Sequence, residues 1–273
     1  MRIHVLTLFP EMIEEALKAG VVGQALRENR FSIKTLNPRV FTSNVHQTVD
    51  GRPFGGGDGM LMLADTMAQA LDSIETNLSA RPRVIHLSPR GTPLTDKKVR
   101  ELASLDELVL ISSRYAGLDQ RFLNTRVDEE ISIGDYVLSG GELPALVIID
   151  SVARLLPGVL GNEQSSEEES FGGASGLLEE PQFTRPREWG GQGVPEALLS
   201  GNHAKIERWK RALRFLVTLD RRPELVQAAS VKVFQEARAV FSELSVEEKA
   251  WCGFKDLDAL EAKLSASQKE KKK

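Results

Sequence analysis

Apolar residues are distributed along the first half of the chain in two alternating patterns. Short, nearly continuous apolar runs, typical of buried strands, occupy residues 3–9, 31–36, 83–87, 107–112 and 130–133. Segments in which apolar residues recur every three or four positions, typical of helices, occupy residues 11–19, 64–74, 96–102 and 141–156. Strands that alternate with helices predict an α/β domain with a mainly parallel sheet.

Turn-forming residues indicate where these elements end. Gly20 is expected to cap the first helix at its C-terminus, and Ser88 and Pro89 are expected to close the third strand. Residues 37–60 are rich in Gly, Pro, Asn, Asp and Thr, and they predict a long functional loop.

The composition changes after Pro157, where Ser, Glu and Gly replace large apolar residues. Helices are predicted again at residues 202–219, 223–228 and 231–244, and Ser245 with Glu248 resembles a capping box before one more. The chain ends in KEKKK, which favours a disordered tail. The predicted organisation is an α/β domain at residues 1–160, a linker at 161–176, a small all-α domain at 177–254 and a tail at 255–273.

Composition restricts the class of protein. Hydrophobic residues make up 41% and charged residues 27% of the 273 residues, which is ordinary for a globular chain. The longest mostly apolar stretch, residues 143–152, is too short to span a membrane, and the N-terminal run lacks the features of a signal peptide. The single cysteine excludes an intrachain disulfide, and the four histidines show no metal-ligand spacing. We therefore expect a cytoplasmic protein and predict no metal site.

Positive charge is concentrated in one region of a chain whose formal net charge is −4. Nine lysines and arginines lie between Arg185 and Arg222, with only four acidic residues among them. Such a region is typical of a nucleic-acid-binding surface, although a solvated helix face explains the charge equally well.

Four loops are rich in glycine and other small residues. Three of them follow predicted strands: HLSPRG at 86–91, SSRYAGLD at 112–119 and IGDYVLSGGE at 133–142. The fourth, VDGRPFGGGDGM at 49–60, lacks the Lys-Ser/Thr of a P-loop and is interpreted by itself as a flexible loop. Because ligands of open α/β sheets bind where strands end, the shared placement predicts a cofactor pocket lined by backbone.

Several of these segments resemble the tRNA (guanine-N1-)-methyltransferase family. The matching runs are residues 49–62, 128–144, 149–161, 184–186 and 199–209. The stretch SIGDYVLSGGELP at 132–144 is nearly diagnostic, and LSGNH at 199–203 supports the match. The resemblance extends over residues 1–254.

The resemblance implies a fold and a reaction. Members belong to the SPOUT class, in which the parallel sheet ends in a C-terminal trefoil knot and a small all-α domain follows. They are homodimers that bind S-adenosyl-L-methionine in the knot and methylate N1 of guanosine-37 of tRNA, next to the anticodon. The implied partners are tRNA and a second copy of the chain, with no membrane and no DNA. By this resemblance the cofactor-binding residues are Leu87, Ser88, Ser113, Tyr115, Gly117, Ile133, Gly134, Asp135, Tyr136, Val137, Leu138, Gly140 and Gly141.

The same resemblance assigns catalytic roles. A general base must remove the N1 proton, and such assistance contributes about 10²- to 10⁴-fold in rate. A guanidinium would stabilise the negative charge that develops on the guanine oxygen. The family's aspartate base matches Glu169, with Glu168 beside it, and its arginine matches Arg154. Ala116 replaces a glutamate associated with metal-dependent activity, which leaves a magnesium requirement open, and Ser113 stands where glycine is common.

The basic region then becomes a candidate tRNA-binding surface whose phosphate contacts would position the RNA without reading its sequence. The candidate tRNA-binding residues are Arg52, Arg185, His203, Lys205, Arg208, Lys210 and Arg214. Trp209 is interpreted as a core residue rather than a platform for a base. Two alternatives stay open: a SPOUT enzyme that acts on another RNA position, and a tRNA-binding homologue with reduced or lost catalysis.

Overall fold

The computed structural model describes residues 1–56, 58–78, 80–161, 165–173, 175–227 and 229–270. The chain divides into two compact units, Met1–Glu163 and Gln164–Lys273, and each is described by itself. Among the described residues, every helix is too short or too polar to cross a membrane.

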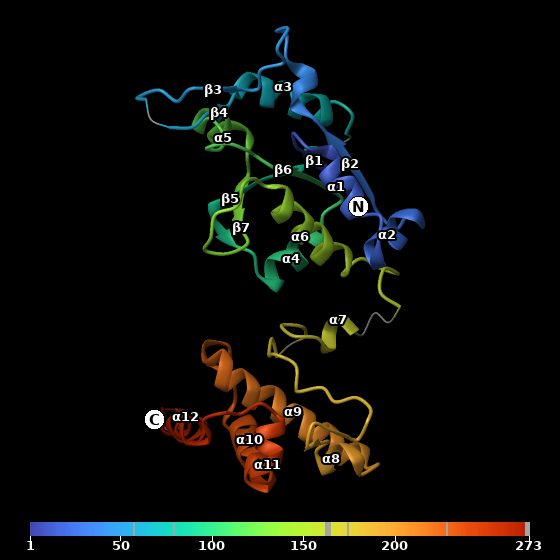
Figure 1. Ribbon diagram of the computed structural model, residues 1–273, viewed down its shortest axis with the longest axis vertical. Coiled ribbons are helices and arrows are strands. Elements are labelled where there is room, and N and C mark those ends of the chain that lie inside the picture. Colours follow the sequence, from blue (N-terminus) through green and yellow to red (C-terminus); the bar gives the residue numbers. More distant parts are fainter. Residues whose placement is uncertain (57, 79, 162–164, 174, 228, 271–273) are drawn as a thin grey trace. The chain divides into compact units, whose positions relative to one another are not determined.

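The first unit is built on a five-stranded sheet in which all neighbouring strands are parallel (Figure 1). Its strands are β1 (Arg2–Leu6), β2 (Ser32–Leu36), β5 (Arg83–Pro93), β6 (Glu107–Ile111) and β7 (Glu129–Ser132), in the order β2-β1-β6-β5-β7. The register places Val5, Leu110 and Ile85 side by side across the three central strands. The parallel α/β sheet predicted from the alternating pattern is therefore confirmed.

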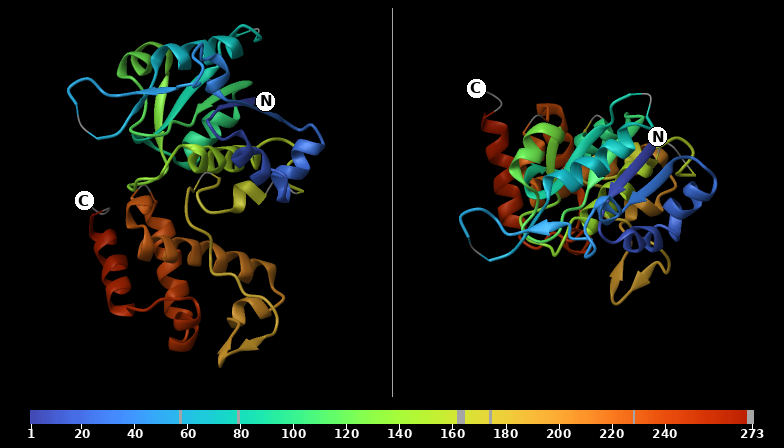
Figure 2. Two further views of the ribbon diagram at one scale, coloured as in Figure 1. Left: turned by 45° about the horizontal axis from the view of Figure 1, so that its top comes forward. Right: turned by 90° about the horizontal axis from the view of Figure 1, so that it is seen from above.

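Helices cover both faces of this sheet (Figures 1 and 2). One face packs against α1 (Pro10–Ala16), α2 (Gly20–Arg27), α4 (Asp96–Ala103) and α6 (Glu142–Ala153), and the other against α3 (Ala64–Glu75) and α5 (Gln120–Arg126). On β6, Leu108 and Leu110 belong to the first core cluster, and Val109 and Ile111 to the second. Because both faces are buried, the central strands are apolar at consecutive positions.

Two of the predicted element ends are wrong. Gly20, with a φ of +68°, does not cap one long helix but begins α2, so that α1 ends at Ala16. Strand β5 does not stop at Ser88 and Pro89: its pairing with β7 is interrupted after Leu87 and resumes at Thr92. A bulge of this kind accommodates proline within a strand and redirects the chain at the edge of a ligand site.

The predicted loop at residues 37–60 contains short regular elements. The 3-10 helix η1 (Pro38–Phe41) opens it, and β3 (Asp50–Gly51) pairs antiparallel with β4 (Leu61–Met62). The rest of the described loop carries no helix or strand.

The second unit consists mainly of helices around its own core. Its elements are α7 (Ser165–Glu168), β8 (Glu188–Trp189), β9 (Gln192–Gly193), α8 (Glu196–Leu199), α9 (His203–Arg221), η2 (Pro223–Val226), α10 (Val231–Glu243), α11 (Val246–Trp251) and α12 (Leu257–Glu270). Phe215 of α9 and Phe234 of α10 meet edge to face, with ring centroids 4.6 Å apart. The capping box of Ser245 and Glu248 is present at the start of α11. The antiparallel pair β8–β9 makes the described unit not purely helical.

The C-terminal segment differs from the expected disordered tail. Residues 257–270 form α12, which packs against α9 and α10 (Figure 2). Leu260 and Leu264 are 0% and 1% exposed and belong to the core of this unit. The physical reason is an apolar stripe at positions 257, 260 and 264, whose helical spacing the surrounding charged residues obscure.

Candidate functional site

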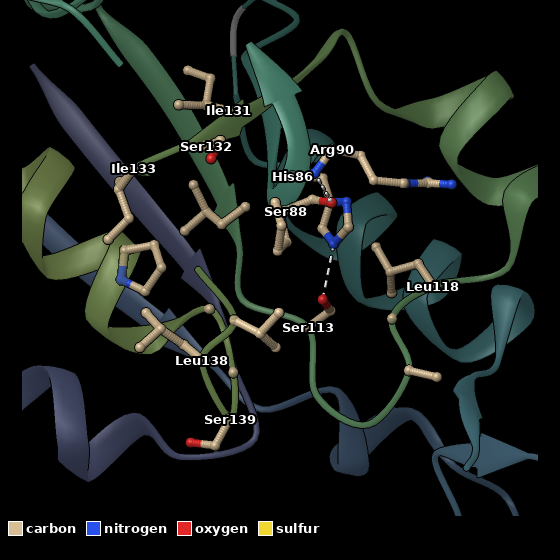
Figure 3. A pocket seen from close by; sticks show the side chains of 18 of the residues that line it. His86, Ser88, Arg90, Ser113, Leu118, Ile131, Ser132, Ile133, Leu138 and Ser139 are labelled. Carbon is tan, nitrogen blue, oxygen red and sulfur yellow. Dashed lines mark hydrogen bonds between the residues drawn. The ribbon is translucent and has the colours of Figure 1, made fainter. Parts of the chain in front are cut away.

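A pocket of about 540 Å³ lies at the bulge of β5 and at the carboxyl ends of β6 and β7. Its wall comes from the β5 bulge, the loop after β6 and the loop between β7 and α6 (Figure 3). Leu61, Gln120 and Pro144, the last in the first turn of α6, also line it. Small-molecule sites enclose about 300–1,000 Å³, so this pocket has the size of a cofactor site.

Backbone contact between two of these loops requires glycine at position 141. The N–H of Gly141 donates to the carbonyl oxygen of Ser113 at 3.1 Å. A Cβ atom on Gly141 would lie 2.6 Å from the Cα of Ser112, which is closer than any side chain tolerates. The chain after β7 can therefore pass this close to the loop after β6 only because residue 141 is glycine.

The loop after β6 is a tight turn held from a second side. Tyr115 adopts a φ of +59°, and Gly117 one of +107°. The N–H of Ala116 donates to Met60 O and the N–H of Met62 donates to Gly117 O, both at 2.9 Å. The 49–60 loop thus ends against this turn, but none of its described residues lines the pocket. Leu61, the first residue of β4, does line it.

A buried carboxylate secures the start of α6. Glu142, which is 1% exposed, accepts a hydrogen bond from Thr7 Oγ1 at 2.8 Å. Its other oxygen lies 2.9 Å from Arg114 Nε in an ion pair whose angle does not make a hydrogen bond. The Arg114 guanidinium also lies 4.4 Å from the centre of the Phe9 ring. These contacts tie the two pocket loops to the end of β1.

A chain of polar contacts crosses the pocket wall. His86 Nε2 lies 2.9 Å from Ser113 Oγ (Figure 3), and His86 Nδ1 lies 2.8 Å from Glu130 Oε1. Burial lowers the pKa of His86 and outweighs the opposing hydrogen bond and charge of Glu130. Burial disfavours ionisation of Glu130, yet the His86 hydrogen bond and the charge of Arg90 hold its pKa below the ordinary value. At neutral pH the pair is therefore a neutral imidazole beside an ionised carboxylate.

The structure brings the predicted cofactor residues together. Twelve of the thirteen line the pocket, and Asp135 does not. Sequence reasoning missed other lining residues, among them His86, Leu118, Gln120 and Ser139. His86, Leu118 and Ser139 lie within the loops singled out in the sequence, so the loop boundaries were the available signal; Gln120, the first residue of α5, had none.

The predicted catalytic residues lie in different units. Arg154 is the C-cap of α6 in the first unit, whereas Glu168 ends α7 and Glu169 follows it in the second. The carbonyl oxygen of Glu168 accepts a hydrogen bond from the guanidinium of Arg214. The predicted base, Glu169, and the arginine predicted to act with it, Arg154, therefore do not belong to the same unit.

Three of the predicted phosphate contacts already pair with carboxylates, among them Lys210, whose Nζ lies 3.7 Å from Glu207 Oε1. Arg208 donates to Glu243 at 2.8 and 2.9 Å, and Arg214 donates to Glu180 at 2.7 Å. The Arg214–Glu180 pair is largely buried, with side chains 19% and 5% exposed, so it serves the fold of this unit. The basic region of the sequence is thus less positive than its count of cations suggests.

The remaining basic candidates are more accessible. His203 and Lys205 lie exposed in the first turn of α9, and Arg52 is exposed in the first unit. Arg185 lines a second-unit pocket of about 610 Å³, together with the paired Lys210. Trp209 also borders that pocket but is 3% exposed within the core cluster, as the core interpretation predicted. Among the described residues, no three His, Cys, Asp or Glu side chains are grouped as metal ligands.

A parallel sheet with helices on both faces and a glycine-walled pocket at its carboxyl edge define a cofactor-binding α/β protein. The chain belongs to the tRNA (Guanine-1)-methyltransferase TrmD family, whose family model matches residues 1–228.

Curated relatives agree with this assignment. A tRNA (guanine-N(1)-)-methyltransferase of Hydrogenovibrio crunogenus is 47% identical over 232 residues, which cover 85% of this chain and 97% of the relative. The protein of the same name from Ralstonia nicotianae is 49% identical over 230 residues, or 84% of this chain and 87% of the relative. One from Neisseria meningitidis is 45% identical over 251 residues, or 89% of this chain and 100% of the relative.

Proposed function

We propose that this protein transfers a methyl group from S-adenosyl-L-methionine to N1 of guanosine-37 in tRNA, as a homodimer in the cytoplasm. The observation that carries the proposal is the pocket, because one of its walls, residues 132–144, lies in the segment whose resemblance to the family is nearly diagnostic, and the family model spans the other walls as well. The names and high coverage of the relatives support the reaction class.

The proposal includes a SPOUT-type trefoil knot in the first unit. The hydrogen bond from Gly141 N–H to Ser113 O supports it, since the chain after β7 returns directly to the loop after β6. The second unit is proposed to bind tRNA through its exposed basic residues, among them Arg185 and Lys205, and through the half-buried Lys210.

The chemistry of the pocket fits the cofactor. Among the described residues that line the pocket, Arg90 alone carries a permanent charge, and hydroxyls, the His86 imidazole, the Gln120 amide and backbone groups supply the remaining polarity. Such a wall suits an adenosine group, which is uncharged and carries hydrogen-bonding atoms on its flat adenine ring and on its ribose. When bound, the cofactor supplies the electrophilic methyl group.

The residues of this chain would hold and move the proton of the guanine. Glu169 is proposed to remove it from N1, with Glu168 able to take the same role. Arg154 would stabilise the charge that builds on the guanine oxygen. Glutamate reaches one methylene further than aspartate, and a misplacement of about 1 Å can cost roughly 10²-fold in rate.

Methyl transfer from labelled S-adenosylmethionine to a tRNA transcript tests the proposal. We expect transfer when the target nucleotide is guanosine and none when it is adenosine. Glu169→Gln should lower kcat by about 10²-fold or more, because the amide cannot accept the proton. Glu167→Gln, two residues earlier in the same acidic run, is the matched control and should retain activity.

If Glu169→Gln keeps wild-type activity, Glu169 has no part in the mechanism, and Glu168→Gln then tests its neighbour. The second candidate function, a tRNA-binding homologue with lost catalysis, is favoured by one observation: Ala116 lines the pocket where the family has a carboxylate. Under that alternative cofactor and tRNA bind but no methyl group moves. Assays with and without magnesium, on wild type and on Ala116→Glu, show whether that carboxylate confers a metal dependence.

A further inference from the structure

Glu130, His86 and Ser113 form a polar chain that the proposed chemistry does not use. The three residues come from β7, β5 and the loop after β6, and they lie 27 and 44 positions apart along the sequence. His86 and Ser113 line the pocket, whereas Glu130 stands behind them. Ser113 occupies a position at which the resemblance leads us to expect glycine, so its hydroxyl is an addition to the pocket wall.

The charge on Glu130 fixes the direction of the hydrogen bonds in this chain. An ionised carboxylate can only accept, so His86 Nδ1, 2.8 Å away, must carry a proton and donate it. Because burial keeps the imidazole neutral, Nε2 then carries a lone pair. Ser113 Oγ, 2.9 Å from Nε2, therefore donates its hydrogen to His86.

A serine hydroxyl has one hydrogen and two lone pairs. Since the hydrogen of Ser113 is directed at His86, the hydroxyl can offer only lone pairs to a ligand in the pocket. S-adenosylmethionine carries several hydrogen-bond donors: the adenine amine, the ribose hydroxyls and the α-ammonium group. The wall thus presents an acceptor to a molecule that is rich in donors.

We propose that Ser113, oriented through His86 by Glu130, is a specificity-determining residue that accepts a hydrogen bond from an N–H or O–H group of the bound cofactor. This inference rests on the proposed function, because it takes the pocket to be the cofactor site. It deepens that function by stating that this part of the pocket wall offers a hydrogen-bond acceptor to the cofactor. Glu130, which does not itself line the pocket, sets that orientation.

Glu130→Gln is proposed to reverse the chain without substituting any residue that lines the pocket. Arg90 Nη2 lies 3.4 Å from Glu130 Oε2, so an amide at this position keeps its oxygen towards Arg90 and turns its NH₂ group to His86. That donor moves the imidazole proton to Nε2, which then donates to Ser113. The hydrogen of the Ser113 hydroxyl then points at the ligand. It meets an N–H or O–H group there, and two donors cannot form a hydrogen bond.

Calorimetric titration with S-adenosylhomocysteine measures the effect. Ser113→Ala and Glu130→Gln should each weaken binding by about three- to tenfold, the effect of one lost hydrogen bond. The double variant should bind no more weakly than Ser113→Ala, because the amide oxygen at position 130 still accepts from Arg90 and no hydroxyl is left for the changed chain to turn. Glu129→Gln is the matched control: Glu129 is the preceding residue of β7, pairs with Lys98 at 3.0 Å and does not line the pocket, so binding should be unchanged.

The pH dependence of wild-type binding gives an independent measurement. The charged groups that face His86 are Glu130 on β7 and Arg90 on its own strand, and its neighbour on β6 is Ile111, which is uncharged. When His86 gains a second proton, Nε2 becomes a donor and the chain reverses as in Glu130→Gln. Affinity should therefore be constant above about pH 6.5 and fall as the pH drops through the lowered pKa of His86, whereas Ser113→Ala should show no such fall.

The inference is overturned if Ser113→Ala binds as tightly as wild type, or if Glu130→Gln weakens binding equally in the Ser113→Ala background. Ser113→Gly is a second variant without the hydroxyl, and circular dichroism shows whether each variant folds. Wild-type protein that does not bind S-adenosylhomocysteine would instead contradict the proposed function, so the two failures are distinguishable.

Discussion

At the scale of single residues, the absence of a Cβ atom on Gly141 allows two loops of the pocket wall to touch. The residue starts α6 with an ordinary φ of −83°, so its backbone conformation does not require glycine. The requirement comes from the neighbouring chain, since a Cβ atom would stand 2.6 Å from Ser112 Cα. Here the absence of a side chain is a condition for two loops to touch.

Gly141→Ala should therefore push these loops apart. We expect the free energy of unfolding to fall by about 1–3 kcal/mol, the usual effect of overpacking, and affinity for S-adenosylhomocysteine to fall with it. Urea denaturation and calorimetric titration measure the two effects. Gly161→Ala is the control, because a Cβ there meets nothing within 4 Å. Equal behaviour of the two variants would show that the loops adjust without cost.

At the scale of an element, α12 shows how a charged sequence can still form part of a core. Its buried face consists of Leu260 and Leu264, and Lys263 on a neighbouring position donates to the carbonyl oxygen of Asp220 at 2.9 Å. The helix is stable because its apolar stripe packs on α9 and α10, since an isolated helix of this length is marginal in water.

Leu264→Ala tests whether α12 stabilises the second unit. Removing a fully buried leucine side chain should lower the free energy of unfolding by about 2–4 kcal/mol. Val246→Ala on α11, where the side chain is 68% exposed, should change it by less than about 0.5 kcal/mol. Denaturant unfolding followed by tryptophan fluorescence measures both, and a negligible effect of Leu264→Ala would mean that α12 is detached in solution.

At the scale of the whole molecule, the two units have separate cores and different aromatic residues. Both tyrosines, Tyr115 and Tyr136, line the pocket of the first unit. All three tryptophans, Trp189, Trp209 and Trp251, belong to the second. Tyrosine and tryptophan emission therefore report on different units.

This division predicts how the cofactor affects unfolding. A ligand at 100 times its Kd stabilises the state that binds it by about 2.7 kcal/mol. S-adenosylhomocysteine should therefore raise the unfolding midpoint of the first unit, followed by calorimetry, and leave the tryptophan-monitored transition of the second unit in place. Equal shifts of both transitions would show instead that the units unfold together.

The sequence predicted some parts of the site and not others. Loops 86–91, 112–119 and 133–142 could be identified because glycine and small residues follow apolar runs, and the structure joins them in one pocket. Asp135 was included by resemblance and does not line it. The polar chain of Glu130, His86 and Ser113 had no sequence signal, because its members meet only through the pairing of separate strands.

What the sequence determined by itself is local: the period of apolar residues specifies strands and helices, and turn residues mark the loops between them. It specified the parallel sheet because consecutive apolar positions need cover on both faces. What only the tertiary structure decided are contacts between distant segments: the bulge that extends β5, the close approach at Gly141, the pairing of Arg214 with Glu180 and the burial of α12. The physical reason is that a residue's local pattern fixes its backbone preference, whereas its partner is fixed by how the elements pack.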